Sequence, residues 1–254
     1  MRMSITKTDN FRQIFENIDG GKILDVACGV GQFIEILQSS LRSWNEIFGL
    51  DMDDHYVSEA RKKFSGDRYR FIRGNSEKIP YQNNDFNFVS ISNGLHHIEM
   101  PEKTLKEMKR VLKPGGYFVI NEMFSDELTE SQISQKLYHH CRVEMDRILG
   151  KSHFYTFEKN EIIRFAEKLK LSGLVVYEYK EEQHDPLNRE TIREYSDKLD
   201  FWLEHIRDHE KYDYLRRNIR ELKERFCKFG ITRPPQLVVM GRKPASQGVH
   251  DTSF

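Results

Sequence analysis

Residues 23–31 read ILDVACGVG, an apolar run that ends in a turn with two glycines. The apolar run over 22–27 is typical of a buried strand, and the residues that follow predict a helix over 32–39. Glycine lets the backbone come close to a ligand, and the first N–H groups of a helix can bind an anion or a carboxylate. The stretch therefore predicts a ligand site where a strand passes into a helix.

The same turn departs from the pattern of dinucleotide-binding folds. That pattern is G-x-G-x-x-G, and Ile34 stands where its third glycine would be. The turn is therefore poorly matched to a pyrophosphate, and an NAD-dependent dehydrogenase is disfavoured.

Apolar runs and amphipathic segments alternate on both sides of this stretch. Strands are expected at 22–27, 47–50, 70–73, 87–92, 117–121, 174–179 and 237–240. Helices are expected at 10–18, 32–39, 55–64, 101–112, 126–149, 156–171 and, as a charged stretch of two helices, 186–229. Such alternation indicates parallel β-α-β units with helices on both faces. The expected fold class is α/β, with a doubly wound, mostly parallel seven-stranded sheet whose last strand is antiparallel.

The domain organisation follows from the same pattern. We expect a single domain over 1–245, followed by a flexible tail at 246–254. Two helical insertions, at about 125–155 and 181–233, leave the carboxyl ends of the fifth and sixth strands. Ligands of such sheets bind at those ends, so the insertions are expected to form a lid.

Composition limits the partners. The 254 residues carry 40 basic and 40 acidic side chains, so no bulk positive field recruits nucleic acid. Three scattered cysteines form neither a disulfide framework nor a zinc pattern. The polar start and the lack of a long apolar run favour a cytoplasmic protein that does not enter the membrane. A monomer or homodimer is expected.

Asp51 ends the second expected strand. A carboxylate at this place can accept hydrogen bonds from both hydroxyls of a ribose. Its alternative role is to cap the next helix, but Asp53 is better placed as that cap. Asp51 is therefore a candidate for binding a nucleoside.

Five ordered motifs now resemble the class I S-adenosylmethionine-dependent methyltransferases, and in particular the small-molecule branch that includes ubiquinone and menaquinone biosynthesis methyltransferases. The motifs are ILDVACGVGQF, FGLDMD, GNSEKIPY, NDFNFVSISNGLHHI and VLKPGGYFVINE. They cover about 22–122, roughly two-fifths of the chain. The resemblance implies S-adenosylmethionine as cofactor and methyl transfer to a small or medium-sized acceptor by in-line displacement.

The resemblance also implies residue roles. Asp25 would hold the amino-acid end of the cofactor, and Asp51 its ribose. Met52 would pack on the adenine, and Asn75, where the family usually has Asp, would accept from the adenine amino group. Asn93 would lie near the methionine part. The remaining cofactor contacts would come from Ala27, which replaces a more usual glycine, and from Gly29, Gly31, Ser76 and Glu77.

The residue that could activate the acceptor is less well defined. His96 and His97 are candidate bases because an imidazole can titrate near neutral pH, although both have a structural alternative. Glu122, after the fifth strand, is a third candidate. His139 and His140 are adjacent on a helix and point in different directions, so no metal site is expected.

The lid supplies candidates for binding the acceptor. They are the aromatic and polar residues Tyr138, His139, Arg142, Tyr155, Tyr195 and Trp202. For each aromatic residue, ordinary core packing is the alternative. A lid of this size suits an enclosed small molecule better than a long nucleic acid.

Two other functions remain open. A methyltransferase acting on tRNA or protein would use a basic surface, and Arg216, Arg217, Arg220 and Lys223 hint at one. Interleaved acidic residues weaken that hint. A cofactor-binding partner subunit without catalysis is the second alternative.

Overall fold

A computed structural model describes residues 4–181 and 185–245. Its described part contains one eight-stranded sheet, in the order β1-β7-β8-β6-β5-β2-β3-β4. The strands are β1 (Ile5–Thr8), β2 (Lys22–Val26), β3 (Glu46–Asp51), β4 (Tyr69–Arg73), β5 (Phe86–Ser92), β6 (Leu112–Met123), β7 (Ser172–Tyr179) and β8 (Gln236–Arg242). The expected α/β class is confirmed, and the seven strands inferred from the sequence become eight because β1 joins the edge beside β7.

The sheet is mostly parallel. β8 lies antiparallel between β6 and β7, as expected for the last strand, while the pairs from β6 through β5, β2 and β3 to β4 are parallel. The chain runs outward from β2 to β4 on one side and from β5 to β6 on the other. The carboxyl ends of β2 and β5 therefore flank the switch point, where open sheets of this kind bind ligands.

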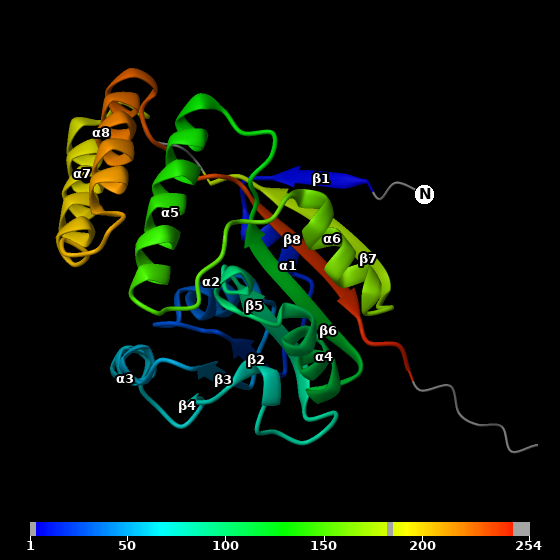
Figure 1. Cartoon of the computed structure of the whole chain (residues 1–254). Coiled ribbons are helices and arrows are strands. Elements are labelled where there is room, and N and C mark those ends of the chain that lie inside the picture. Colours follow the sequence, from blue (N-terminus) through cyan, green and yellow to red (C-terminus); the bar gives the residue numbers. More distant parts are fainter. Residues whose placement is uncertain (1–3, 182–184, 246–254) are drawn as a thin grey trace, which may run out of the picture.

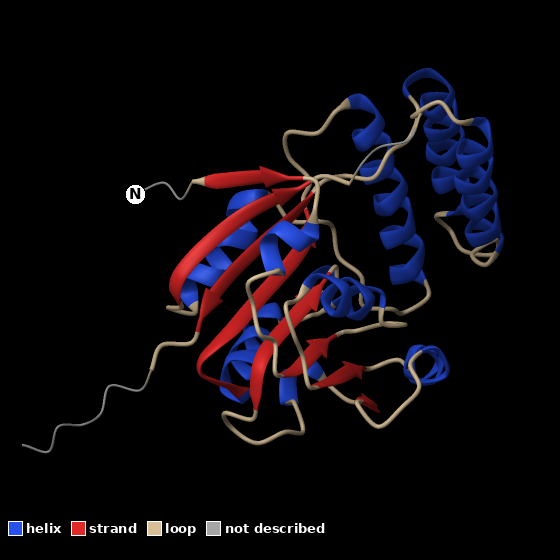
Figure 2. Cartoon of the chain, turned by 180° about the vertical axis from the view of Figure 1, so that it is seen from behind, coloured by secondary structure: helices blue, strands red, loops and turns tan. Residues whose placement is uncertain are grey.

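Helices cover both faces of the sheet (Figures 1 and 2). Apolar side chains of α1, α2 and α3 form one buried cluster with the sheet, and those of α4 and α6 form the other. This is the doubly wound arrangement that the sequence predicted. The bounds are α1 (Phe11–Phe15), α2 (Gln32–Ser40), α3 (Asp54–Lys63), α4 (Pro101–Val111) and α6 (Lys159–Lys168).

Three further helices belong to the two insertions: α5 (Glu130–Ile148), α7 (Arg189–Glu204) and α8 (Tyr212–Phe229). Figure 1 shows α7 and α8 next to α5 and away from the sheet. Their apolar faces meet in a separate buried cluster that includes Met145, Leu199 and the fully buried Phe226. The charged stretch expected over 186–229 is indeed two helices, and their outer faces carry its charges.

The two remaining expectations concern a membrane-spanning helix and the C-terminal tail. No helix among residues 4–181 and 185–245 is long and apolar enough to cross a membrane. The tail expected at 246–254 lies outside the described residues, and so do residues 182–184 of the second insertion.

Candidate functional site

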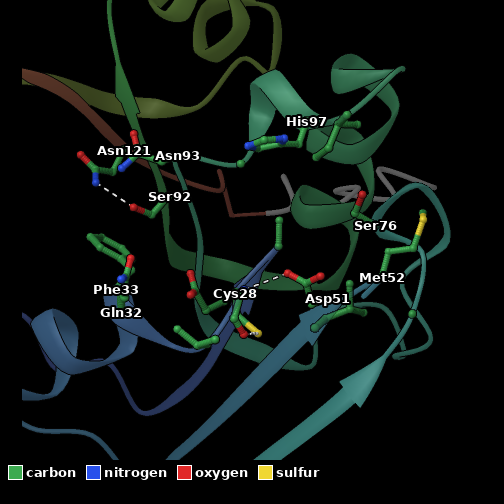
Figure 3. Close-up of a pocket in the computed structure, with 18 of the residues that line it drawn as sticks. Cys28, Gln32, Phe33, Asp51, Met52, Ser76, Ser92, Asn93, His97 and Asn121 are labelled. Carbon is green, nitrogen blue, oxygen red and sulfur yellow. Dashed lines mark hydrogen bonds between the residues drawn. The ribbon is translucent and has the colours of Figure 1, made fainter. Parts of the chain in front are cut away.

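A cavity of about 740 Å³ opens at the carboxyl ends of β2, β3 and β5. Figure 3 shows side chains from these strands and from the turns after them pointing toward it. Its volume lies within the usual range of small-molecule sites, roughly 300–1,000 Å³. Candidates from the sequence on its wall are Asp25, Ala27, Gly29, Asp51, Met52, Asn75, Ser76, Glu77, Asn93 and His97.

The glycine turn forms the floor of the cavity. Ala27 and Gly29 have positive φ angles of 53° and 52°, which bend the chain sharply after β2. Gly29 lines the cavity, and a Cβ built on it would meet nothing within 4 Å. Gly31 caps the start of α2 with φ of 83° but is not on the cavity wall. Its predicted cofactor contact is therefore not what the structure shows. A Cβ there would lie 2.4 Å from the Phe64 ring.

Asp51 links the second strand to the glycine turn. Its Oδ2 accepts a hydrogen bond of 2.8 Å from the Gly29 N–H, and its Oδ1 accepts one of 2.9 Å from the Asp53 N–H. A carboxylate has about four lone-pair sites, so both oxygens can accept further hydrogen bonds from a ligand. Asp53 is the N-cap of α3 and accepts from the His55 N–H, so the helix cap is Asp53, as expected.

Asp25 is almost completely buried at the deep end of the cavity. The Ser90 hydroxyl donates to its Oδ1 over 2.7 Å. Burial raises the pKa of Asp25 to about 7, the Ser90 hydrogen bond opposes that rise, and the negative charge of Asp51 adds to it. A cationic group of a ligand placed here would stabilise the ionised carboxylate.

The wall has an open apolar part after β3 and a polar part after β4. Met52 is 61% exposed, so its flexible side chain is free to pack on a flat ring. Asn75 Oδ1 accepts from the Glu77 N–H over 2.8 Å, so its amide oxygen already caps a local turn. Ser76 is buried, and its hydroxyl is hydrogen-bonded to that of Thr104. Glu77 forms a salt bridge with Lys103.

The ends of β5 and β6 supply amide groups. Asn93 has a positive φ of 46°, and its Oδ1 accepts from the Met123 N–H over 3.0 Å. Asn121 is buried on the cavity wall, and its Nδ2 donates to Ser92 Oγ. Its Oδ1 has no hydrogen-bond partner among the described residues. A buried acceptor without a partner costs about 1–3 kcal/mol, so a ligand N–H or O–H facing Asn121 would be stabilising.

Asn121 was missed by the sequence analysis, which chose its neighbour Glu122. Successive side chains of a strand point to opposite faces, so only one of the two can face the cavity. Glu122 is fully buried, accepts from the Leu95 N–H over 3.0 Å, and lies 2.6 Å from His96 Nδ1. The alternation of side chains along a strand therefore predicts that either Asn121 or Glu122 faces the site. It does not predict which of the two does.

The adjacent residues His96 and His97 lie in different places relative to the cavity. His97 lines the cavity, whereas His96 is 2% exposed and lies behind the wall with Glu122. Of the three candidate catalytic residues, the structure therefore brings one to the cavity. His96 and Glu122 form a buried pair that holds the turn carrying His97.

His97, on the cavity wall, packs with a group of three histidines that lie behind it: His96, His139 and His153. The ring centroids of His97 and His153 are 4.2 Å apart, and those of His96 and His139 are 4.9 Å apart. Burial, with repulsion from neighbouring histidines, lowers the pKa of His97 to about 3 and that of His139 to about 2. A base with such a pKa accepts protons poorly at neutral pH. This lowered pKa does not favour the role of general base for which the sequence made His97 a candidate.

The residues expected to bind the acceptor lie elsewhere. Tyr138 packs against Tyr195 and Trp202 in the buried cluster of α5, α7 and α8, and Arg142 lies over the Trp202 ring. Their sequence pattern reflects core packing, the alternative noted above. Tyr155 is exposed and donates to Glu144, and His139 belongs to the histidine group. None of the six is among the residues that line the described cavity.

The insertions reach the cavity through other residues. Ser152, from the segment between α5 and α6, and Arg233, just before β8, are both on its wall, and so is Gln236 of β8. Arg233 also pairs with Glu181. No periodic sequence pattern predicts these three residues, because the path of the folded chain decides which loop residues reach a site.

The donor set fits S-adenosylmethionine, the group implied by the motifs. A buried carboxyl could meet an ammonium, a second carboxylate could meet hydroxyls, an exposed methionine could meet a ring, and the unpaired Asn121 oxygen could meet an N–H. The glycine turn leaves room for close approach of the ligand. All of these features lie on the wall of one cavity.

Comparison with known families supports this interpretation. A family model described as a methyltransferase domain matches residues 24–120. This segment is a methyltransferase domain. The match ends within β6, so it includes the glycine turn, Asp51 and the His96–His97 turn. The resemblance to class I S-adenosylmethionine-dependent methyltransferases is confirmed.

Individual relatives agree with the family match. A demethylmenaquinone methyltransferase of Bacillus velezensis is 34% identical over 123 residues, which are 47% of this chain and 53% of that protein. The chain thus spans about half the length of the first curated relatives it matches.

Solved structures share the overall fold of the chain. The YcgJ protein of Bacillus subtilis has a TM-score of 0.59 at 16% identity, covering 92% of this chain and 96% of that one. A phosphoethanolamine N-methyltransferase 2 of Haemonchus contortus, solved with phosphomonomethylethanolamine and S-adenosylhomocysteine, has a TM-score of 0.54 at 16% identity. It covers 92% of this chain and 51% of that one.

Proposed function

We propose that the protein transfers a methyl group from S-adenosylmethionine to a small or medium-sized acceptor. The observation that carries the proposal is the placement of Asp25, Gly29, Asp51 and Asn93 around one cavity at the switch point of the sheet. The family match over residues 24–120 supports the same function. When bound, S-adenosylmethionine supplies a methyl carbon on a positively charged sulfur, which an electron-rich acceptor atom can displace.

Each part of the wall has a proposed role in binding. The carboxylate of Asp25 pairs with the ammonium of the amino-acid end, and that of Asp51 accepts from the ribose hydroxyls. The thioether side chain of Met52 packs on the adenine, and the Ser76 backbone N–H donates to the adenine ring. Asn93 and Asn121 orient the part nearest to the acceptor.

The acceptor side is proposed to lie by His97, Ser152 and Arg233. Since His97 is a weak base, its proposed role is to orient the acceptor by hydrogen bonding rather than to remove a proton. Turn residues held by a buried pair are well fixed, and fixed orientation contributes strongly to rate.

A methyltransferase for tRNA or protein is less well supported. Of the basic residues on α8, Arg216 pairs with Asp213 and Lys223 pairs with Asp200. Such pairs reduce the positive field available to phosphates. A partner subunit without catalysis remains the second candidate, and the label-transfer result below distinguishes it. Cytoplasmic location and a monomer or homodimer complete the proposal.

Calorimetric titration with S-adenosylhomocysteine and with NAD tests the cofactor. We expect saturable binding of S-adenosylhomocysteine and none of NAD. The reverse result would overturn the proposal. Incubation with methyl-labelled S-adenosylmethionine and a cell extract should then label a small molecule, which mass spectrometry identifies. Label in RNA or protein would favour that alternative, and cofactor binding without any label would favour the non-catalytic subunit.

Cofactor affinity should depend on pH through Asp25. The free carboxyl has a pKa raised to about 7, and a bound ammonium would lower it again. Binding below pH 7 therefore releases a proton, and affinity for S-adenosylhomocysteine should rise by up to about tenfold per pH unit from about pH 5.5 to 7. It should level off above pH 7. Calorimetry across this range measures the slope.

The variant Asp25→Asn is the control for this dependence. It removes the titrating group but keeps the size of the side chain. Its affinity should be lower at pH 7.5 and nearly independent of pH. The same slope in the variant and in the original protein would assign the proton to another group.

A further inference from the structure

Three histidines from distant parts of the chain converge next to the cavity wall. His96 follows β5, His139 lies on α5, and His153 lies in the segment between α5 and α6. One ligand atom of each lies within 4.8 Å of the others. His96 and His153 are 2% and 4% exposed, and His139 is half-buried.

The hydrogen bonds decide which ring atoms are available. His96 Nδ1 lies 2.6 Å from Glu122 Oε1, and His153 Nδ1 lies 2.8 Å from Asp146 Oδ2. These contacts assign the proton of each ring to Nδ1 and leave Nε2 with its lone pair. The Nε2 atoms of His139 and His153 are buried without a hydrogen-bond partner among the described residues.

This is the arrangement of a transition-metal site. A metal-binding histidine usually donates its other ring N–H to a carboxylate, which fixes the ring and raises its basicity. Two buried ring nitrogens without a partner in the described part of the chain, beside a third imidazole, are groups whose lone pairs a cation would satisfy. Around a tetrahedral zinc ion, nitrogens at 2.0–2.1 Å would be about 3.3 Å apart, so small rotations of the rings suffice.

We propose that His96, His139 and His153 bind a divalent zinc-like cation, with Glu122 and Asp146 orienting two of the ligands. Three imidazoles favour zinc over magnesium or calcium, which prefer oxygen. The proposal replaces the expectation from sequence that no metal site exists. It does not depend on methyl transfer, because metal binding is measured directly.

The proposed metal site lies next to the cavity wall, so a bound cation would affect the residues of that wall. His97 and Ser152, both on the cavity wall, are the direct neighbours of the ligands His96 and His153. The Phe154 N–H also donates to the His96 carbonyl over 2.7 Å. A bound cation would therefore join the methyltransferase domain to the first insertion beside the proposed acceptor. Three ligands leave a fourth position for water or for an oxygen or sulfur atom.

The full-length protein, stripped with a chelator, tests the site by titration with zinc. We expect about one equivalent to bind with a dissociation constant below about 1 μM, with a rise in Tm. Cobalt should give the visible absorption of a tetrahedral site. His139→Ala and His153→Ala should each lose this binding. Asp146→Asn should weaken it by about 10- to 100-fold.

His140→Ala is the matched control. His140 is next to His139 on α5, and its Nε2 is also buried without a partner among the described residues, but its ring packs on Tyr155. Zinc binding should be unchanged in this variant. The proposal is overturned if the original protein binds no zinc below about 1 μM, a result that needs no folded variant. It is also overturned if folded His139→Ala keeps the original affinity.

Discussion

Replacing Asp51 with alanine should weaken binding of S-adenosylhomocysteine by roughly 100-fold or more. Each hydrogen bond to a charged group contributes about 1.5–3 kcal/mol. Both hydroxyls of the proposed ribose would lose their hydrogen bond to the Asp51 carboxylate. The variant also removes the acceptor of the Gly29 N–H at 2.8 Å, so the floor of the cavity loosens at the same time. Calorimetry at constant pH and salt measures the dissociation constant.

Asp53→Ala is the control for this prediction. Asp53 lies two residues away, caps α3, and is not on the cavity wall. Loss of the cap should cost about 1 kcal/mol of unfolding free energy with little change in cofactor affinity. If Asp51→Ala bound as tightly as the original protein, the ribose assignment would be wrong. If both variants weakened binding equally, the effect would lie in the helix rather than in the carboxylate.

The core of the fold could be predicted because its signals are local. Each central strand is a short apolar run, and each is followed by an amphipathic helix, so periodicity alone gives the doubly wound sheet. β1 was missed because Ile5–Thr8 is mostly exposed at the edge of the sheet. It has no alternation of buried and exposed residues to detect. Its pairing with β7 is a tertiary contact.

The cofactor half of the site was predictable for a similar reason. Parallel strands bring their carboxyl ends to one edge of the sheet, so residues at or just after the carboxyl ends of β2, β3 and β5 must meet there. Asp25, Asp51 and Asn93 all lie on the cavity wall. Gly31 shows the limit of this argument, since a glycine in the same turn serves the backbone instead.

The insertions were harder to predict because their apolar residues have two possible partners. The aromatic residues Tyr138, Tyr195 and Trp202 would suit a ligand pocket, yet they pack on one another. An isolated group of helices must bury an apolar face of its own, and that need takes priority. The convergence of His96, His139 and His153 depends on how α5 docks, which no local pattern contains.

Two single-methyl substitutions in the glycine turn should separate stability from binding. Gly31→Ala should lower the unfolding free energy by about 2–5 kcal/mol. The sum comprises about 1–2 kcal/mol for the left-handed backbone and about 1–3 kcal/mol for overpacking. The overpacking arises because the new Cβ lies 2.4 Å from a Phe64 ring that is itself buried. A loss of this size is a large part of the stability of an ordinary domain, about 5–15 kcal/mol.

Gly29→Ala carries the same backbone cost but no clash, since its Cβ meets nothing within 4 Å. Its Tm should fall by only a few degrees, against roughly 5–15 °C for Gly31→Ala. Because Gly29 lines the cavity, its methyl group would stand where we propose that the ligand approaches the backbone. Affinity for S-adenosylhomocysteine should therefore fall more in Gly29→Ala than in folded Gly31→Ala. Thermal unfolding and calorimetry on both variants measure the two effects. The opposite ranking in affinity would mean that the ligand approaches the turn at Gly31, and the assignment of the cavity floor would have to change.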